Sequence, residues 1–131
     1  MIEITRINHI GLRISSLETT RVFYEKLGFV FLVGPIGPEP VAIMEHPSGV
    51  NINFILNASE NKSLNVLMDV PEKHTGYTHV ALEVSDLQDT QKRLESLGFV
   101  ITGGPIVTPE GASFIFIRDP DDNVIEFHKP A

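Results

Sequence analysis

The sequence contains no cysteine. This absence excludes disulfides, thiolate metal ligands and a cysteine nucleophile. Any metal ion must therefore be held by histidine, carboxylate or amide side chains, which suit divalent ions of hard or intermediate character.

Positive charge and long apolar runs are also scarce. Ten Lys and Arg residues stand against 17 Asp and Glu residues, for a net charge of −7. Nucleic acids and anionic membranes both favour a basic surface, so we expect neither as a partner. A small neutral or anionic substrate would need local positive charge, which a bound metal ion could supply. No apolar run approaches the roughly 18 residues that span a bilayer. The first residues, MIEITRINHIGLRI, lack the basic and apolar regions of a secretory signal, and a cytoplasmic location is expected.

The chain does contain an internal repeat. Residues 8–35 and 78–105 are similar at a constant offset of 70, and both include the tetrapeptide LGFV and the later pair GP. This offset pairs His9 with His79. Further along the chain the offset becomes 73. So many matches in the same order indicate two copies of one structural unit.

Each copy contains the same succession of local signals. An alternating strand is followed by a capped helix that ends at a glycine, and then by three more strands. In the first copy we expect strands at His9–Ile14, Phe29–Val33, Val41–His46 and Val50–Leu56, and a helix from Ser15 or Ser16 to Lys26. A loop is expected at 34–38 and a turn at 47–49. In the second copy we expect strands at Thr78–Val84, Phe99–Thr102, Ser113–Ile117 and Val124–His128, and a helix from Ser85 or Asp86 to Leu97. A turn is expected at 119–123.

These signals predict an α+β fold built from two tandem βαβββ modules. The modules are expected at 1–56 and 77–131, joined by a polar linker at 57–76. Within the linker, Val66-Leu67-Met68 is apolar and is expected to form an edge strand or a flap. Because each sheet has a helix on one face only, the two sheets should cover each other and form a cupped, barrel-like mixed sheet with the helices outside.

Strand alternation predicts which side chains line this cup. On the first strand of each copy the apolar residues pack under the helix, so His9 and His79 face the other way. On the last strands the same rule places Asn53 and Glu126 on the cup side, together with Asn51, Val124 and His128. The pattern leaves open whether the pair Phe114 and Phe116 or the pair Ile115 and Ile117 lies on that side.

Four polar positions are therefore expected to converge: His9, Asn53, His79 and Glu126. Two imidazoles and one carboxylate form the triad that binds Fe(II), Mn(II), Zn(II), Co(II) or Ni(II) and leaves coordination positions open. The Asn53 amide is a weak neutral ligand, which would bind the ion, bind a water or shape the pocket. We predict a divalent-metal site made by the two copies together.

At this level of detail the sequence resembles the vicinal oxygen chelate superfamily. The resemblance lies in the segments HIGL, FYEKLGF, HVALEV and DPDDNVIEF, and it extends over nearly the whole chain. The superfamily includes glyoxalase I, methylmalonyl-CoA epimerase, extradiol dioxygenases, fosfomycin resistance enzymes and bleomycin resistance proteins. The resemblance implies ligands on the first and last strands of each module, which correspond to the four positions named above. It also implies a homodimer.

The resemblance implies that the metal acts as a Lewis acid toward two neighbouring substrate oxygens. Glu126 would be both ligand and catalytic base. Asn53, Arg13 and Glu83 would be substrate-binding side chains, with Arg13 or Glu83 tuning the pocket. Glyoxalase I-like proteins usually have Glu or Gln where this chain has Asn53, which cannot act as a base. The leading hypothesis is a glyoxalase-like lyase or isomerase acting on a small α-oxygenated carbonyl compound.

Three alternatives remain from the same resemblance. An Fe(II) ring-cleaving dioxygenase would need a further acid or base, for which His46, His74, Tyr77 and His128 are candidates. A fosfomycin-type transferase would need a basic cluster that the sequence does not show. A non-catalytic, antibiotic-binding protein of the bleomycin-resistance kind would not need the His/His/Glu triad.

Overall fold

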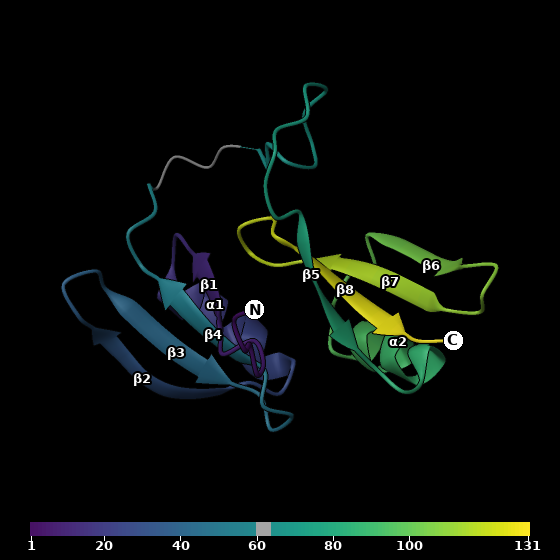
Figure 1. Cartoon of the computed structure of the whole chain (residues 1–131), viewed down its shortest axis with the longest axis horizontal. Helices are drawn as coiled ribbons and strands as arrows, with labels where there is room; N and C mark the ends of the chain where they lie inside the picture. Colours follow the sequence, from purple (N-terminus) through teal and green to yellow (C-terminus); the bar gives the residue numbers. More distant parts are fainter. Residues whose placement is uncertain (60–63) are drawn as a thin grey trace. The chain divides into compact units, whose positions relative to one another are not determined.

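The computed structural model describes residues 1–59 and 64–131 of the chain. The chain divides into two compact units, Met1–Lys62 and Ser63–Ala131. The described part of each unit contains one helix and four strands in the order βαβββ (Figure 1). The predicted α+β class and the tandem repeat are therefore confirmed.

The first unit contains a mixed sheet in which only one strand pair is parallel. Its strands lie in the order β1-β4-β3-β2, with β1 parallel to β4 and the other pairs antiparallel. Its elements are β1 (Ile10–Arg13), α1 (Leu17–Lys26), β2 (Val30–Ile36), β3 (Val41–Glu45) and β4 (Asn51–Ile55).

The second unit repeats this topology. Its strands lie in the order β5-β8-β7-β6, again with one parallel pair, β5 and β8. Its elements are β5 (His79–Glu83), α2 (Leu87–Ser96), β6 (Gly103–Val107), β7 (Ser113–Arg118) and β8 (Val124–Lys129). Among the described strands each sheet is open and does not close into a barrel by itself.

The helix ends follow from local sequence. The side-chain oxygens of Ser16 and Asp86 accept hydrogen bonds from the backbone N–H three residues further on, at 3.3 and 2.9 Å, so these residues are the N-caps. After each helix Gly28 and Gly98 adopt φ values of 99° and 87°, which glycine reaches without a Cβ clash. Both helices have ten residues, and neither is long and apolar enough to cross a membrane.

Each helix covers one face of its own sheet. Ala42, Met44, Ile52 and Phe54 are buried beneath α1, together with Tyr24 of the helix itself. In the second unit α2 packs on β7 and β8, and the equivalent residues Ile115, Ile117, Ile125 and Phe127 are buried. Alternation then places Phe114 and Phe116 on the opposite face. The helix-free face of each sheet is therefore the one with the candidate site residues.

Two predicted strand positions are wrong. The loop expected at 34–38 begins inside a strand, since β2 continues to Ile36, and the strand expected at Phe99–Thr102 is replaced by β6 at Gly103–Val107. Both strands contain a Gly-Pro pair and show register shifts against their neighbours. They lie at the sheet edges, where proline's missing N–H breaks no ladder and bulges are tolerated.

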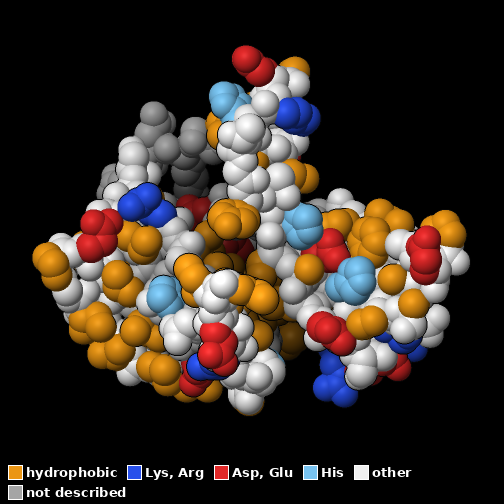
Figure 2. All heavy atoms as spheres, in the orientation of Figure 1, with side chains coloured by type: hydrophobic (Ala, Val, Ile, Leu, Met, Phe, Trp, Pro, Cys, Tyr) orange, Lys and Arg blue, Asp and Glu red, His pale blue; other side chains and the backbone are white. Residues whose placement is uncertain are grey.

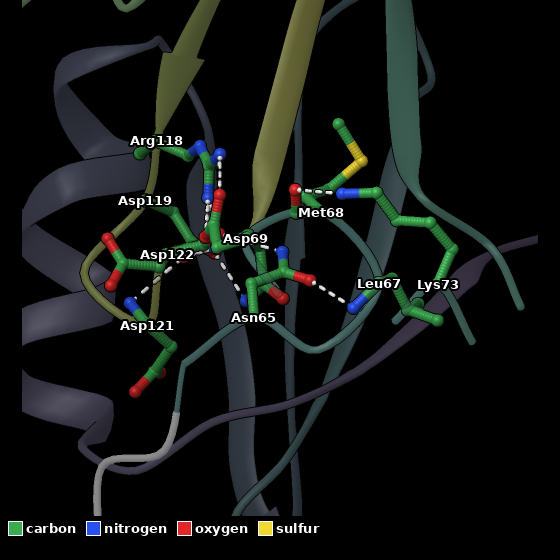
Figure 3. A network of polar contacts seen from close by, with 10 residues as sticks. Asn65, Leu67, Met68, Asp69, Lys73, Arg118, Asp119, Asp121 and Asp122 are labelled. Carbon is green, nitrogen blue, oxygen red and sulfur yellow. Dashed lines mark hydrogen bonds and ion pairs between the residues drawn. The ribbon is translucent and has the colours of Figure 1, made fainter. Parts of the chain in front are cut away.

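The apolar segment Val66-Leu67-Met68 does not form the expected edge strand. It lies in a turn of the second unit, ahead of β5. The backbone N–H of Leu67 donates to Asn65 Oδ1 at 3.1 Å, and Asn65 Nδ2 donates to the carbonyl of Asp122 at 3.1 Å (Figure 3). Residues 60–63 of the expected linker lie outside the described residues.

Candidate functional site

The strand registers place Asn53 and Glu126 at equivalent points of the two units. In the first unit Asn53 is the partner of Gly11 on β1, and in the second Glu126 is the partner of Ala81 on β5. The neighbour is a small residue in both cases, which leaves room above the sheet at this point. The match between Asn53 and Glu126 that the offset of 73 predicts is thus present in the backbone pairing.

In the second unit the structure brings His79 and Glu126 together. The ring Nε2 of His79 lies 3.2 Å from Oε1 of Glu126. The Glu126 side chain is 10% exposed and that of His79 is 37% exposed. A carboxylate this buried requires polar partners, and a half-exposed imidazole provides one while remaining open to a ligand.

His128 contacts the same carboxylate from the neighbouring position on β8. Its ring Nδ1 donates to Oε2 of Glu126 at 2.7 Å. The imidazole stacks on the ring of Phe114, with centroids 5.7 Å apart and planes 4° apart. Phe116 in turn meets His79 edge to face at 6.0 Å. Both carboxylate oxygens of Glu126 therefore have a histidine partner, and each histidine contacts an aromatic ring of β7.

Strand alternation predicts His128 on this face, but its contact with Glu126 was not predicted. The signal was available, because residues two apart in a strand lie on one face. Figure 2 shows histidine and acidic side chains among hydrophobic ones on the visible face of the second unit.

The first unit offers His9 and Asn53. His9 is exposed, and its ring Nδ1 donates to Oδ1 of Asn8 at 2.8 Å. The equivalent pair in the second unit is Thr78 and His79, whose Oγ1 and Nδ1 are also 2.8 Å apart. An outer partner on Nδ1 leaves Nε2 to meet a ligand, as is usual for metal-binding histidine. The Asn53 amide makes no hydrogen bond with any residue that the structure describes.

These residues suit a divalent metal in their chemistry. Two ligands of one ion, each about 2.0–2.2 Å from it, lie about 3.0–3.4 Å apart. The 3.2 Å between His79 Nε2 and Glu126 Oε1 falls in that range. Within the described residues, no three His, Asp or Glu side chains form a group that could hold a metal ion. His9 and Asn53 belong to one unit and His79 and Glu126 to the other, so the convergence of all four stays a prediction.

Arg13 and Glu83 are on the same faces as the candidate ligands. Arg13 donates from Nε to Asn57 Oδ1 at 3.0 Å and from Nη2 to Glu39 Oε1 at 3.3 Å. Its charge is therefore already matched by a carboxylate. Glu83 is exposed and is the register partner of His128, and its side chain makes no hydrogen bond among the described residues. Their roles in substrate binding stay predictions.

A second arginine, Arg118, shares the face of Phe114 and Phe116 by strand alternation. It binds Asp69 through two hydrogen bonds of 2.8 Å, one to each carboxylate oxygen (Figure 3). The hydrogen bond from Arg118 lowers the pKa of Asp69, and the same bond raises the pKa of Arg118. Arg118 thus anchors the segment before β5 to the sheet. The sequence contained no signal for this pair, because 49 residues separate its members.

Comparison with known proteins agrees with this architecture. The sequence profile of the family described as "Glyoxalase/Bleomycin resistance protein/Dioxygenase superfamily" matches residues 6–127. A virulence protein from Salmonella typhimurium is 25% identical, with 99% of this chain and 100% of that chain covered and a TM-score of 0.71.

Two further solved structures share the fold at lower identity. A glyoxylase/bleomycin resistance protein/dioxygenase domain from Frankia is 19% identical, with 98% of this chain and 100% of that chain covered and a TM-score of 0.79. A mutant of the fosfomycin resistance protein FosX from Listeria monocytogenes, complexed with Mn(II) and 1S,2S-dihydroxypropylphosphonic acid, is 16% identical. The match covers 96% of this chain and 90% of that one, with a TM-score of 0.68.

Proposed function

Because the chain belongs to the glyoxalase/bleomycin resistance protein/dioxygenase superfamily, we propose that it is a divalent-metal-dependent lyase or isomerase of the glyoxalase kind. Its substrate would be a small α-oxygenated carbonyl compound with two neighbouring oxygens. The observation that supports this is the His79–Glu126 pair, a ligand-spaced imidazole and carboxylate on the helix-free face of the second unit.

The metal would be Zn, Ni, Mn, Fe or Co, and its ligands would be His9, His79 and Glu126. Asn53 would act as a weak fourth ligand or would bind a water. When bound, the ion would act as a Lewis acid that polarises the substrate carbonyl. FosX, which shares the fold, was crystallised with Mn(II). We further propose that the protein is a homodimer, as the sequence resemblance implies.

The chain's own residues would do the proton chemistry. Glu126 is the carboxylate that would take a proton from the substrate carbon or return it, and its Oε2 accepts a hydrogen bond from His128. The low exposure of Glu126 limits competition from water. Phe116, in edge contact with His79, restricts the orientation of the imidazole plane.

The proposal is tested by metal content and turnover together. Purified protein is analysed by inductively coupled plasma mass spectrometry and then titrated with Ni(II), Mn(II), Fe(II) or Zn(II). At least one ion should bind and raise the melting temperature. The loaded protein is next assayed with methylglyoxal–thiol adducts, catechols and acyl-CoA epimers. Absence of binding by all four ions contradicts the proposal, as does binding without any turnover of a carbonyl substrate.

A second candidate is an Fe(II) ring-cleaving dioxygenase. It is favoured by His128, which the structure places against Glu126, where this chemistry needs an additional acid or base. Oxygen uptake with catechols after anaerobic iron loading would support it. The fosfomycin-type transferase gains less support, because Arg13 and Arg118 both already pair with carboxylates. Tight binding of a drug without turnover would instead indicate a bleomycin-resistance-type protein.

A further inference from the structure

One side chain beside the candidate ligands has no part in the ligand set proposed above. His128 donates from Nδ1 to Oε2 of Glu126, while the other oxygen of that carboxylate faces His79. The imidazole of His128 is itself held by its stack on Phe114. This makes a continuous chain of contacts from an aromatic ring on β7 to the ligand-facing oxygen of Glu126.

The repeat shows that the fold does not require a histidine here. Glu83 of β5 pairs with His128 of β8, and the equivalent Arg13 of β1 pairs with Ile55 of β4. The stacked ring has no counterpart either, because Val41 stands opposite Ile55 where Phe114 stands opposite His128. The aromatic–histidine pair therefore occurs in the unit with a carboxylate at the ligand position, and an aliphatic pair occurs in the unit with an amide.

We propose that His128 is a positioning residue that fixes the carboxylate of Glu126. By holding Oε2, it directs Oε1 toward His79 Nε2 and keeps the two ligand atoms at the spacing that one ion requires. Partners of this kind typically change metal affinity by about 10–100-fold when they are removed. The expected effect on metal affinity rests on the proposed function, whereas the hydrogen bond itself does not.

Two substitutions separate the hydrogen bond from the packing. His128→Phe keeps an aromatic ring against Phe114 and removes the donor, while His128→Asn keeps an N–H at the same distance from the backbone and removes the ring. Mn(II) affinity is measured for each by electron paramagnetic resonance of the free ion. We expect His128→Phe to bind about 10–100-fold more weakly than wild type and His128→Asn to recover much of that loss. Gln88→Asn, at an exposed position of α2 on the other face of the second sheet, is the control and should match wild type.

A second measurement does not depend on metal. Long-range ¹H–¹⁵N spectra of the metal-free protein at about pH 8.5, where an ordinary imidazole is neutral, show which ring nitrogen carries the proton. We expect the His128 proton on Nδ1, and we expect Glu126→Leu to abolish that preference in a protein that retains its circular dichroism spectrum.

The outcomes distinguish this proposal from the proposed function. A proton on Nε2 of His128 in the wild-type protein would overturn the positioning role, as would a His128→Phe variant with wild-type Mn(II) affinity. Equal weakening in His128→Phe and His128→Asn would also overturn it, because the ring rather than the donor would then matter. If wild type binds no metal but His128 carries its proton on Nδ1 in a Glu126-dependent manner, the enzymatic proposal fails and the positioning contact stands.

Discussion

Asn53 and Glu126 occupy the same position in the two units of the chain, opposite Gly11 on β1 and Ala81 on β5 respectively. Two equivalent points of a repeated fold therefore carry an amide and a carboxylate. The carboxylate is charged, binds metal ions strongly and can exchange a proton. The amide is neutral, binds metal ions weakly and cannot act as a base. The two units are thus chemically unequal where their backbones are alike.

This inequality predicts opposite effects of two isosteric substitutions on metal affinity. Since ligand charge governs affinity for a divalent ion, we expect Asn53→Asp to bind Mn(II) about tenfold more tightly and Glu126→Gln at least about 100-fold more weakly. Isothermal titration calorimetry measures both. Asn51→Asp adds the same charge two residues away, beside Glu45, and should have a smaller effect than Asn53→Asp. Unchanged affinity in both Asn53→Asp and Glu126→Gln would remove these positions from the metal site.

The repeat also supplies a matched pair of threonines in the helices. Oγ1 of Thr20 in α1 is buried and has no hydrogen-bond partner among the described residues, whereas Oγ1 of the equivalent Thr90 in α2 donates to the carbonyl of Asp86 at 2.7 Å. An unsatisfied buried hydroxyl costs about 1–3 kcal/mol, and a satisfied one contributes about 1 kcal/mol. Thr20→Val should therefore raise the free energy of unfolding by about 1 kcal/mol, and Thr90→Val should lower it by a similar amount.

Urea denaturation of both variants and of wild type checks this prediction. The substitution is the same in both helices, so the difference between them isolates the hydrogen bond from the change of side-chain shape. A destabilisation of equal size in both variants would show that Thr20 has a partner that Val cannot replace.

Most of the fold could be predicted from the sequence, because its signals are local and occur twice. The N-caps, the glycines after the helices and the alternation on β4 and β8 each act within a few residues. The strand failures lie at β2 and β6: Gly34-Pro35 was assigned to a loop, and the strand of the second copy was expected to end before Gly104-Pro105. Glycine and proline usually interrupt strands, but at a sheet edge a bulge accommodates both, and edge position is a property of the whole sheet.

The candidate site also combines features that the sequence predicts with features that it does not. Alternation sufficed to place His79 and Glu126 on one face, and their 3.2 Å contact agrees with it. The stack of His128 on Phe114 depends on the register between β7 and β8, which the sequence did not determine. The Asp69–Arg118 pair joins residues far apart in the chain, so no periodicity could reveal it.

That pair predicts a pH-dependent anchor for the segment before β5. The pKa of Asp69 is lowered from its ordinary 3.8 mainly by the hydrogen bond from Arg118. The ionised form is therefore favoured in the folded state, and the stabilisation is complete above pH 3.8 and is lost as the pH falls through the lower folded pKa. The ¹³C shift of the Asp69 carboxyl should titrate below 3.8 in wild type and move up toward that value in Arg118→Leu.

At neutral pH the same anchor should control access to Lys73. The ammonium group of Lys73 donates to the carbonyl of Met68 within the anchored segment. Asp69→Asn removes the charge that holds Arg118, so a lysine-specific protease should cleave after Lys73 faster than in wild type. Cleavage after Lys26, at the end of α1, serves as the control and should not change. Equal cleavage rates after Lys73 in both proteins would show that the ion pair does not hold the segment.

A last prediction compares two glycines of the second unit that both have positive φ. A Cβ on Gly98 would meet no heavy atom within 4 Å, whereas one on Gly104 would lie 2.6 Å from the carbonyl oxygen of Phe114 and 3.2 Å from the Cα of Ile115. Gly98→Ala should therefore cost only the strain of a left-handed alanine, about 1–2 kcal/mol. Gly104→Ala adds a clash with the backbone of β7, which cannot move without disturbing its pairing with β8. We expect it to lower the unfolding free energy more than Gly98→Ala does, and also to weaken Mn(II) binding, because Phe114 supports His128. Equal stabilities of the two variants in urea would mean that β6 can shift away from β7 at little cost.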